Sequence, residues 1–337
     1  MKKVLCFGEL LLRLSPRLSG EWIARGETAV FVGGAELNVA RALARWEQPV
    51  GYCTALPDHY LATEVIDWVA AQGIDVTAIH RSGARIGTYY LPQGADMKAA
   101  GVIYDRAYSS FWELAPGDID WDAALEGVDW LHFSAISPAL NEQAAAVCAE
   151  AAKAAADRGL TVSVDLNYRA KLWQYGKTPL EVMPELVQYC DVIMGNIWAE
   201  QQMLGIPVPV DLRDDKEAYL EQSQATSEAI RKAYPRCRQV ANTFRFDAGA
   251  GVRYYATLLD AQGFFVSPEH SARTIVDKVG SGDTFMAGLI YGNCGGWWAQ
   301  ELIDFAAAAA FNKLFIPGDA TTASVDAIKK AHNNHVY

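Results

Sequence analysis

Short apolar runs alternate with helix-like segments along most of this chain, and this alternation constrains the fold more than any other feature. Runs near 4–8, 50–54, 128–134, 161–165, 190–194 and 237–243 are typical of buried strands. Parallel strands need a crossover segment, usually a helix, between them. The pattern therefore predicts an α/β fold with a doubly wound, mostly parallel sheet and helices on both faces. A chain of 337 residues, 51% of them hydrophobic, can bury such a core.

Two strand-rich pieces interrupt the alternation. Residues 10–32 read as strands with turn signals, and residues 86–106 alternate as strands around a turn cluster at 92–94. We expect these pieces to form one small β-sheet that projects from the main domain as a lid. The predicted domains are an α/β domain (1–9, 33–85 and 107–337) and a β-sheet lid (10–32 and 86–106).

Composition argues against several classes of partner. The net charge is −11 without a run of lysine or arginine, which disfavours nucleic acid and anionic membrane surfaces. No apolar run approaches membrane-spanning length, and Glu9 and Arg13 interrupt the N-terminal apolar run, so no signal peptide is expected. Cys6, Cys148 and Cys190 lie in apolar segments and are interpreted as buried free thiols. These features predict a cytoplasmic protein.

The segment Asp277-Lys278-Val279-Gly280-Ser281-Gly282-Asp283 opens an apolar helix expected at about 283–293. A helix start presents unpaired N–H groups and a positive dipole end, and glycines let the backbone approach a phosphate closely. Asp283 would repel that phosphate. It fits if it accepts a proton from a hydroxyl that attacks the phosphate, or if it is simply the helix N-cap. The segment alone leaves both roles open.

Other polar residues follow predicted strands, where ligands of open α/β sheets bind. They are Glu9, the loop Asp165–Arg169, and Asn196 with Glu200. Asn196 could be a helix N-cap, or it could hold the water shell of Mg²⁺ together with Glu200. Arg169 should face the cleft, and Arg13 and Arg106 lie in small-sheet strands. Arginine binds carboxylates through a bidentate fork.

Other kinds of site lack support. Gly176-Lys177-Thr178 lacks the upstream glycine of a P-loop, and Gly249-Ala250-Gly251 lacks the third glycine of a dinucleotide fingerprint. The histidines and cysteines show no metal-ligand spacing, and no nucleophile elbow supports Ser-His-Asp hydrolysis.

Two motifs carry a family resemblance over nearly the whole chain. Gly33-Gly34-Ala35-Glu36-Leu37-Asn38 near the start and Asp277-x-x-Gly280-Ser281-Gly282-Asp283 near the end, with Asn196 and Glu200 between them, resemble the ribokinase-like carbohydrate kinases. The resemblance implies ATP-dependent phosphorylation of a sugar hydroxyl. It implies that Asp283 is the base, that Gly280, Ser281 and Gly282 form an anion hole, and that the nucleotide meets Asn167, Asn196, Thr243, Gly280, Gly282 and Asn312. It further implies Mg²⁺ held through water by Asn196 and Glu200, and it makes K⁺ at Asp277 a candidate.

Within this family the chain looks most like 2-keto-3-deoxygluconate kinases. The likeness implies a substrate site made of Glu9, Gly34, Asn38, Tyr89, Tyr104, Arg106, Asp165 and Arg169. Arg106 and Arg169 would hold the carboxylate of a small-molecule sugar acid, whose terminal hydroxyl is phosphorylated. Open lid edges predict a homo-oligomer formed through the lid. The alternatives are a kinase for a neutral sugar such as fructose or for a nucleoside, and a non-catalytic sugar-acid-binding relative.

The chain also departs from the family pattern. Ser281 stands where alanine is usual, and serine is small enough to leave the anion hole intact. Many relatives have a glycine-rich loop at the position of Phe244 and Arg245, and these two side chains are bulkier than glycine. The expected nucleotide contacts at 242–247 are therefore in question. The segment 205–222 is long and charged, and the sequence assigns it no role.

Overall fold

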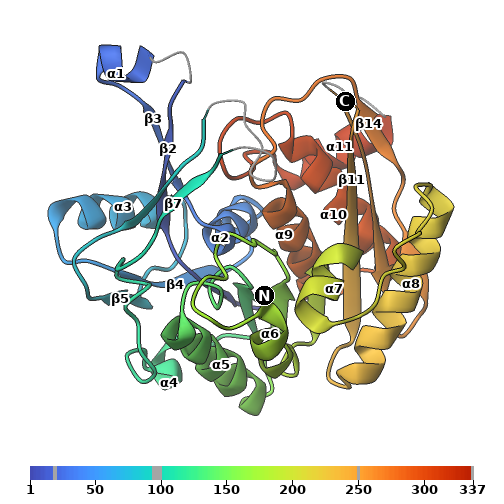
Figure 1. Ribbon diagram of the computed structural model, residues 1–337, viewed down its shortest axis with the longest axis horizontal. Coiled ribbons are helices and arrows are strands. Elements are labelled where there is room, and N and C mark those ends of the chain that lie inside the picture. Colours follow the sequence, from blue (N-terminus) through green and yellow to red (C-terminus); the bar gives the residue numbers. More distant parts are fainter. Residues whose placement is uncertain (18–20, 93–100, 249–250, 335–337) are drawn as a thin grey trace.

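The main sheet of the protein is mostly parallel. The structure, a computed structural model, describes residues 1–17, 21–92, 101–248 and 251–334 (Figure 1). The ten strands follow the order β13-β12-β11-β10-β9-β8-β1-β4-β5, and β14 lies beside β12. All neighbours from β5 to β11 pair in parallel, and β12 pairs antiparallel with β11, β13 and β14. The strands are β1 Val4–Phe7, β4 Val50–Leu56, β5 Ile79–Arg81, β8 Trp130–Ser134, β9 Thr161–Asp165, β10 Val192–Gly195, β11 Gln239–Ala248, β12 Gly251–Leu259, β13 Phe264–Val266 and β14 His270–Ala272.

Helices cover both faces of this sheet, which confirms the doubly wound prediction. Successive side chains of a strand point to opposite faces. In β1, Val4 and Cys6 enter one core with α2, α9 and α10, whereas Leu5 and Phe7 enter a second core with α5 and α6. The helices are α2 Ala35–Arg45, α3 Tyr60–Ala70, α4 Trp121–Ala124, α5 Glu142–Asp157, α6 Pro179–Val187, α7 Ile197–Leu204, α8 Lys216–Ala233, α9 Ser281–Cys294, α10 Ala299–Lys313 and α11 Val325–Asn334.

The alanine run 306–310 lies in the tightest helix contact next to the site. All five alanines are fully buried in α10. A Cβ added to Gly288 of α9 would lie 2.7 Å from the Cα of Ala306. The small side chains thus let α9 and α10 approach closely, and this contact holds the start of α9 in place.

The two strand-rich pieces form a separate small sheet, as predicted. Its strands are β2 Leu11–Ser15, β3 Ala29–Gly33, β6 Gly87–Tyr90 and β7 Ile103–Asp105, in the order β3-β2-β6-β7. The sheet projects from the main domain at the upper left of Figure 1.

Residues 10–32 are not strand-like throughout, because helix α1 (Glu21–Arg25) stands between β2 and β3. Glu21 carries ion pairs to Arg17 and Arg25, four residues before and after it. The Glu21–Arg25 spacing brings the two charges together on a helix, which favours a helical turn at this position.

Further predictions concern thiols and membrane spans. Cys6, Cys148 and Cys190 are buried free thiols, as expected. In the described part of the chain, no helix combines the length and apolar character that a membrane span requires.

Candidate active site

A cavity of about 750 Å³ lies where the carboxyl ends of β1, β9, β10 and β11 face the small sheet. It brings together almost all of the predicted site residues. Those lining it are Glu9, Gly34, Asn38, Tyr89, Tyr104, Arg106, Asp165, Asn167, Arg169, Asn196, Thr243, Gly280, Ser281, Gly282 and Asp283. The predicted residues Glu200, Asp277 and Asn312 are not part of its lining.

Asp283 lies in the first turn of α9 and is buried at the cavity wall. The N-cap of α9 is Gly280, with a φ of 77°, so the interpretation of Asp283 as the cap is wrong. Instead, Asn38 Nδ2 of α2 donates a hydrogen bond of 2.7 Å to Asp283 Oδ2. Burial raises the pKa of Asp283 to about 8, an effect that the Asn38 hydrogen bond opposes and the charge of Asp165 reinforces. Such a carboxyl group can exchange a proton near neutral pH.

The start of α9 approaches the loop after α10 so closely that only glycine fits at Gly280. A Cβ there would lie 1.7 Å from the backbone oxygen of Asp319. Ser281 Oγ donates a hydrogen bond of 2.9 Å to the backbone oxygen of Ala310 in α10. The serine that departs from the family pattern therefore adds a bond between the two helices. The helix start itself lines the cavity and can receive an anion.

On the wall of the cavity, Glu9 holds Arg106 in place. Arg106 Nε lies 2.5 Å from Glu9 Oε2, and Ser109 Oγ donates to Glu9 Oε1. Both members of the ion pair are buried. Removing either one would leave an uncompensated charge in the interior. Glu9 thus holds the Arg106 side chain in place in addition to lining the cavity.

Arg169 and Asn38 each present an unpaired polar atom at the cavity. Arg169 Nη1 donates to the backbone oxygen of Tyr168 at 3.1 Å, whereas its Nε is buried without a partner. Asn38 Oδ1 is likewise buried without a partner among the described residues. Buried polar atoms are nearly always satisfied, so the cavity calls for a ligand with an acceptor near Arg169 and a donor near Asn38. A carboxylate and a hydroxyl have these properties.

Asp165 also lines the cavity. Its Oδ1 accepts the backbone N–H of Asn167 at 3.1 Å. Burial raises the pKa of Asp165 to about 7, and the charge of Arg169 opposes this rise. The charges of Asp165, Arg169 and Asp283 are therefore coupled across one cavity.

The Phe244 side chain does not obstruct the cavity. Alternate residues of β11 face opposite sides of the sheet, so Thr243 and Arg245 line the cavity while Phe244 points away and is fully buried. The Phe244 ring stacks on Tyr255 at 4.9 Å and on Tyr219 at 6.0 Å. Val208, from the segment 205–222, joins this cluster. That segment therefore helps cover the outer face of β11.

Sequence reasoning missed two cations that line the cavity near the start of α9, Arg245 and Lys278. Lys278 pairs with Asp247 at 2.9 Å. The signal for Arg245 was available, because period-two alternation along β11 places it on the same side as Thr243.

The two residues predicted to hold magnesium, Asn196 and Glu200, have different environments. Asn196 Oδ1 accepts the N–H of Ala199 at 2.9 Å, which establishes it as the N-cap of α7. Glu200 is fully buried, with the polar side chains of Thr226 and Asn242 beside it. Burial raises the Glu200 pKa to about 7. The described residues contain no group of three His, Cys, Asp or Glu suited to a metal ion.

Comparison with known proteins decides the family. A family model described as pfkB family carbohydrate kinase matches residues 1–322. The chain belongs to the PfkB family of carbohydrate kinases. This kinase is 35% identical to the crystallised 2-dehydro-3-deoxygluconokinase of Thermotoga maritima, with a TM-score of 0.88 and coverage of 99% of this chain and 100% of the other.

Two curated relatives extend the comparison. The 2-dehydro-3-deoxygalactonokinase of Haloferax volcanii is 28% identical over 97% of this chain and 96% of its own. The 2-dehydro-3-deoxygluconokinase of Bacillus subtilis is 24% identical over 86% and 82%. The predicted ribokinase-like fold and carbohydrate kinase class are thus confirmed.

Outside the cavity, Arg13 of the small sheet contacts carboxylates of the loops before α9 and after α10. Arg13 Nη2 lies 2.8 Å from Asp319 Oδ1 and 3.6 Å from Asp277 Oδ2. Tyr89 also donates its hydroxyl to Asp319 Oδ2 at 3.1 Å. Arg13 is therefore engaged with these carboxylates and is not part of the cavity lining. The predicted nucleotide residue Asn312 is half-buried in α10.

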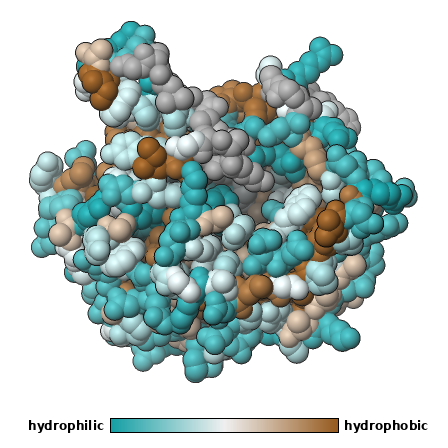
Figure 2. All heavy atoms as spheres, in the orientation of Figure 1, coloured by the Kyte–Doolittle hydropathy of each residue, from teal (hydrophilic) through white to brown (hydrophobic). Residues whose placement is uncertain are grey.

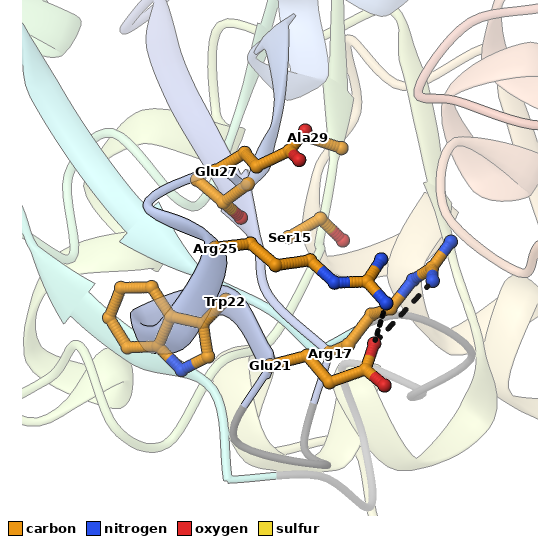
Figure 3. A pocket seen from close by; sticks show the side chains of 8 residues that line it. Ser15, Arg17, Glu21, Trp22, Arg25, Glu27 and Ala29 are labelled. Carbon is orange, nitrogen blue, oxygen red and sulfur yellow. Dashed lines mark ion pairs between the residues drawn. The ribbon is translucent and has the colours of Figure 1, made fainter.

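A second hollow of about 310 Å³ lies on the small sheet of the kinase (Figure 3). Arg17, Trp22 and Arg25 line it, and both arginines point toward Glu21. No predicted site residue lines it, and we assign it no part in the reaction.

Proposed function

We propose that this kinase transfers the γ-phosphoryl group of ATP to the terminal hydroxyl of a 2-keto-3-deoxy sugar acid, with 2-keto-3-deoxygluconate as the preferred substrate. One observation carries the proposal: a single cavity is lined by the buried Asp283 at a helix start and by Arg106 and Arg169. A neutral sugar does not require two arginines. The names of the relatives from Thermotoga, Haloferax and Bacillus agree with this substrate class.

Asp283 is the base in this proposal. Its carboxylate accepts the proton of the substrate hydroxyl while the hydroxyl oxygen attacks the γ-phosphorus, and the bond from that phosphorus to ADP breaks. Asn38 fixes the Asp283 carboxylate through the 2.7 Å hydrogen bond. The N–H groups at Gly280–Gly282 stabilise charge on the transferring group. Positioning and electrostatics supply most of the rate.

The nucleotide side of the cavity suits a polyphosphate. The start of α9 offers N–H groups, and Arg245, Lys278 and Thr243 line the adjacent wall. Asn167 and Asn196 also line the cavity and complete the proposed nucleotide contacts. The contact between Asn312 and the nucleotide stays a prediction. It requires the nucleotide to extend beyond the residues that line this cavity.

The described residues do not provide Mg²⁺ with a direct ligand set. Asn196 uses its oxygen for the helix cap, and Glu200 is buried behind the lining. We propose that Mg²⁺ enters with the nucleotide phosphates, and we assign it no protein-bound step. Magnesium would neutralise phosphate charge.

We also propose that the small sheet closes over the cavity as a lid and forms a homo-oligomer contact. Tyr89 and Tyr104 of this sheet line the cavity, so its position affects access of water to the site. The cytoplasmic location stays a prediction that rests on the buried thiols.

The function is tested by measuring ADP release with Mg-ATP on 2-keto-3-deoxygluconate, its galactonate-derived epimer, fructose and ribose. Selective turnover of the keto-deoxy acids is expected. Asp283→Asn should lower kcat by about 100-fold or more, because general-base catalysis is lost, with little change in sugar-acid affinity. Turnover of only a neutral sugar would refute the substrate, and near-normal kcat in Asp283→Asn would refute the base.

Carboxylate recognition is tested best at Arg169, because Arg106 cannot be removed without stranding Glu9. Arg169→Gln should raise KM for the sugar acid about 10-fold to 100-fold, since a charged hydrogen bond contributes about 1.5–3 kcal/mol. The matched control is Arg213→Gln, whose side chain is 66% exposed. An unchanged KM in Arg169→Gln would contradict the role.

A further inference from the structure

A lysine ammonium is buried directly behind the start of α9. Lys313, in the last turn of α10, has no exposed surface. Its Nζ donates a hydrogen bond of 2.8 Å to the backbone oxygen of Ile316. Its Cε lies 3.5 Å from where a Cβ of Gly280 would be. Fully buried lysines are rare unless they are paired, so this position requires an explanation.

Two loops enclose this lysine and bring carboxylates toward it. The backbone N–H groups of Val276 and Asp277 donate to the backbone oxygen of Leu314 at 2.8 and 3.1 Å. Gly318 N–H donates to Asp277 Oδ2 at 3.1 Å. The loop before α9 and the loop after α10 are thus tied together around the Lys313 side chain.

The charges in this cluster balance. Asp277 and Asp319 are the carboxylates, and Arg13 and Lys313 are the cations. Arg13 makes direct ion pairs with both acids. Burial lowers the pKa of Lys313 to about 8, and the charges of Asp277 and then Asp319 oppose this fall. With both carboxyl groups ionised and both bases protonated, the formal charges of these four groups sum to zero.

A free K⁺ ion beside Asp277 would have to compete with contacts that the protein already makes there. Asp277 Oδ1 already accepts the N–H of Val279 at 3.0 Å, and Oδ2 accepts that of Gly318. The Ile316 oxygen is taken by Lys313. An added cation would also bring a positive charge into a buried cluster that is already neutral, which is costly. The K⁺ that the family resemblance suggested at Asp277 therefore conflicts with this chain's own residues.

We propose that Lys313 is a built-in cation that takes the place of an exchangeable monovalent ion and positions the α9 start that receives the phosphoryl group. The catalytic part of this inference rests on the proposed kinase function. Lys313 acts through the loops 276–280 and 314–319 and does not touch substrate, so it is a positioning residue. The consequence is that activity of the natural protein is indifferent to K⁺.

The first test measures thermal unfolding without substrate, so it is independent of the proposed function. The natural protein and Lys313→Met are compared in KCl and in tetramethylammonium chloride of equal ionic strength. Lys313→Met leaves the cluster with one net negative charge, which a small cation can neutralise. Its Tm should rise by about 3 °C or more in KCl, with saturation, whereas the Tm of the natural protein should be equal in both salts.

The second test measures kcat in the same two salts. The natural protein should show equal rates. Lys313→Met should lose about 10-fold to 100-fold in tetramethylammonium, as expected for a misplaced catalytic element, and regain most of it in KCl. Lys329→Met, a surface substitution next to Glu301, is the matched control and should respond to neither salt.

Two results would overturn the inference. One is a higher rate or a higher Tm of the natural protein in KCl than in tetramethylammonium chloride. This measurement needs no variant, so it tests the inference even when Lys313→Met does not fold. The other is a folded Lys313→Met that gains neither Tm nor kcat from K⁺. If no sugar turns over, the proposed function fails, while the Tm comparison still tests the buried cation.

Discussion

At the scale of residues, the decisive feature is the environment of Asp283. The carboxyl group is buried, receives Asn38 Nδ2 and is coupled to Asp165 and Arg169. Burial disfavours the charged form, so the pKa rises, while each favourable contact lowers it. A base with a raised pKa is stronger once deprotonated, and it must lose its proton before it can act.

This environment predicts the pH dependence of catalysis. Since only deprotonated Asp283 is a base, kcat/KM should rise with pH through a midpoint near the pKa of about 8. Asn38→Ala removes a contact that lowers this pKa, so the midpoint should move to higher pH. The measurement is kcat/KM for the sugar acid between pH 5 and 10. A midpoint that does not move in Asn38→Ala would contradict the assignment.

A stability control for the same group needs no activity. The folded pKa of Asp283 is raised above the ordinary value of 3.8. Its stabilising contribution is therefore complete below that ordinary value and is lost as pH rises through about 8. The Tm of the natural protein should fall relative to Asp283→Asn between pH 5 and pH 9.

At the scale of elements, helix α9 owes its position to close contacts at its start and at its middle. Gly288 admits Ala306, and Gly280 admits the backbone of Asp319. The left-handed φ of 77° at Gly280 also suits glycine. The glycines thus serve packing as well as anion binding, which the motif alone does not reveal.

Alanine substitutions at the two glycines of the motif should differ in their effect on stability. Gly280→Ala adds left-handed strain and a collision with Asp319, so it should destabilise the protein by about 2 kcal/mol or more and abolish activity. Gly282→Ala meets only Met194 Cε at 3.9 Å, so it should retain the Tm while lowering kcat. Denaturant unfolding and ADP release provide the comparison. Equal destabilisation by both substitutions would contradict this account.

At the scale of the whole molecule, the small sheet is joined to the main domain through charge and exposes apolar side chains. Arg13 and Tyr89 reach Asp319 across the boundary. The face in Figure 2 is mainly hydrophilic, with scattered brown atoms, some of them on the projecting small sheet. Ile23, Val30 and Ile103 in this part of the chain are each more than half exposed. Exposed apolar groups on sheet edges favour pairing between subunits.

The predicted homo-oligomer can be disrupted at these edges. Val30 and Ile103 lie on β3 and β7, the two outer strands. The double substitution Val30→Lys and Ile103→Lys should convert the oligomer to monomers, because two buried charges per subunit would be unpaired. Sedimentation velocity measures the mass. Leu180→Lys, at an exposed position of α6, is the control. A natural protein that sediments as a monomer would refute the proposal.

The sequence by itself determined the fold class and most of the cavity lining. Apolar periodicity depends on neighbours in the chain, and the glycine motif marks a helix start, so both are readable locally. Strand ends and this helix start converge in any doubly wound sheet, which is why Asp165, Arg169, Asn196 and Asp283 meet.

Only the tertiary structure decided which partner each charged side chain has. Glu9 and Arg106 are 97 residues apart, and Asn38 and Asp283 are 245 apart. Such pairings have no local period, and burial, which sets the pKa values of Asp283 and Lys313, depends on every element packed around them. The same long-range packing turned Phe244 away from the cavity and buried the Lys313 side chain behind the start of α9.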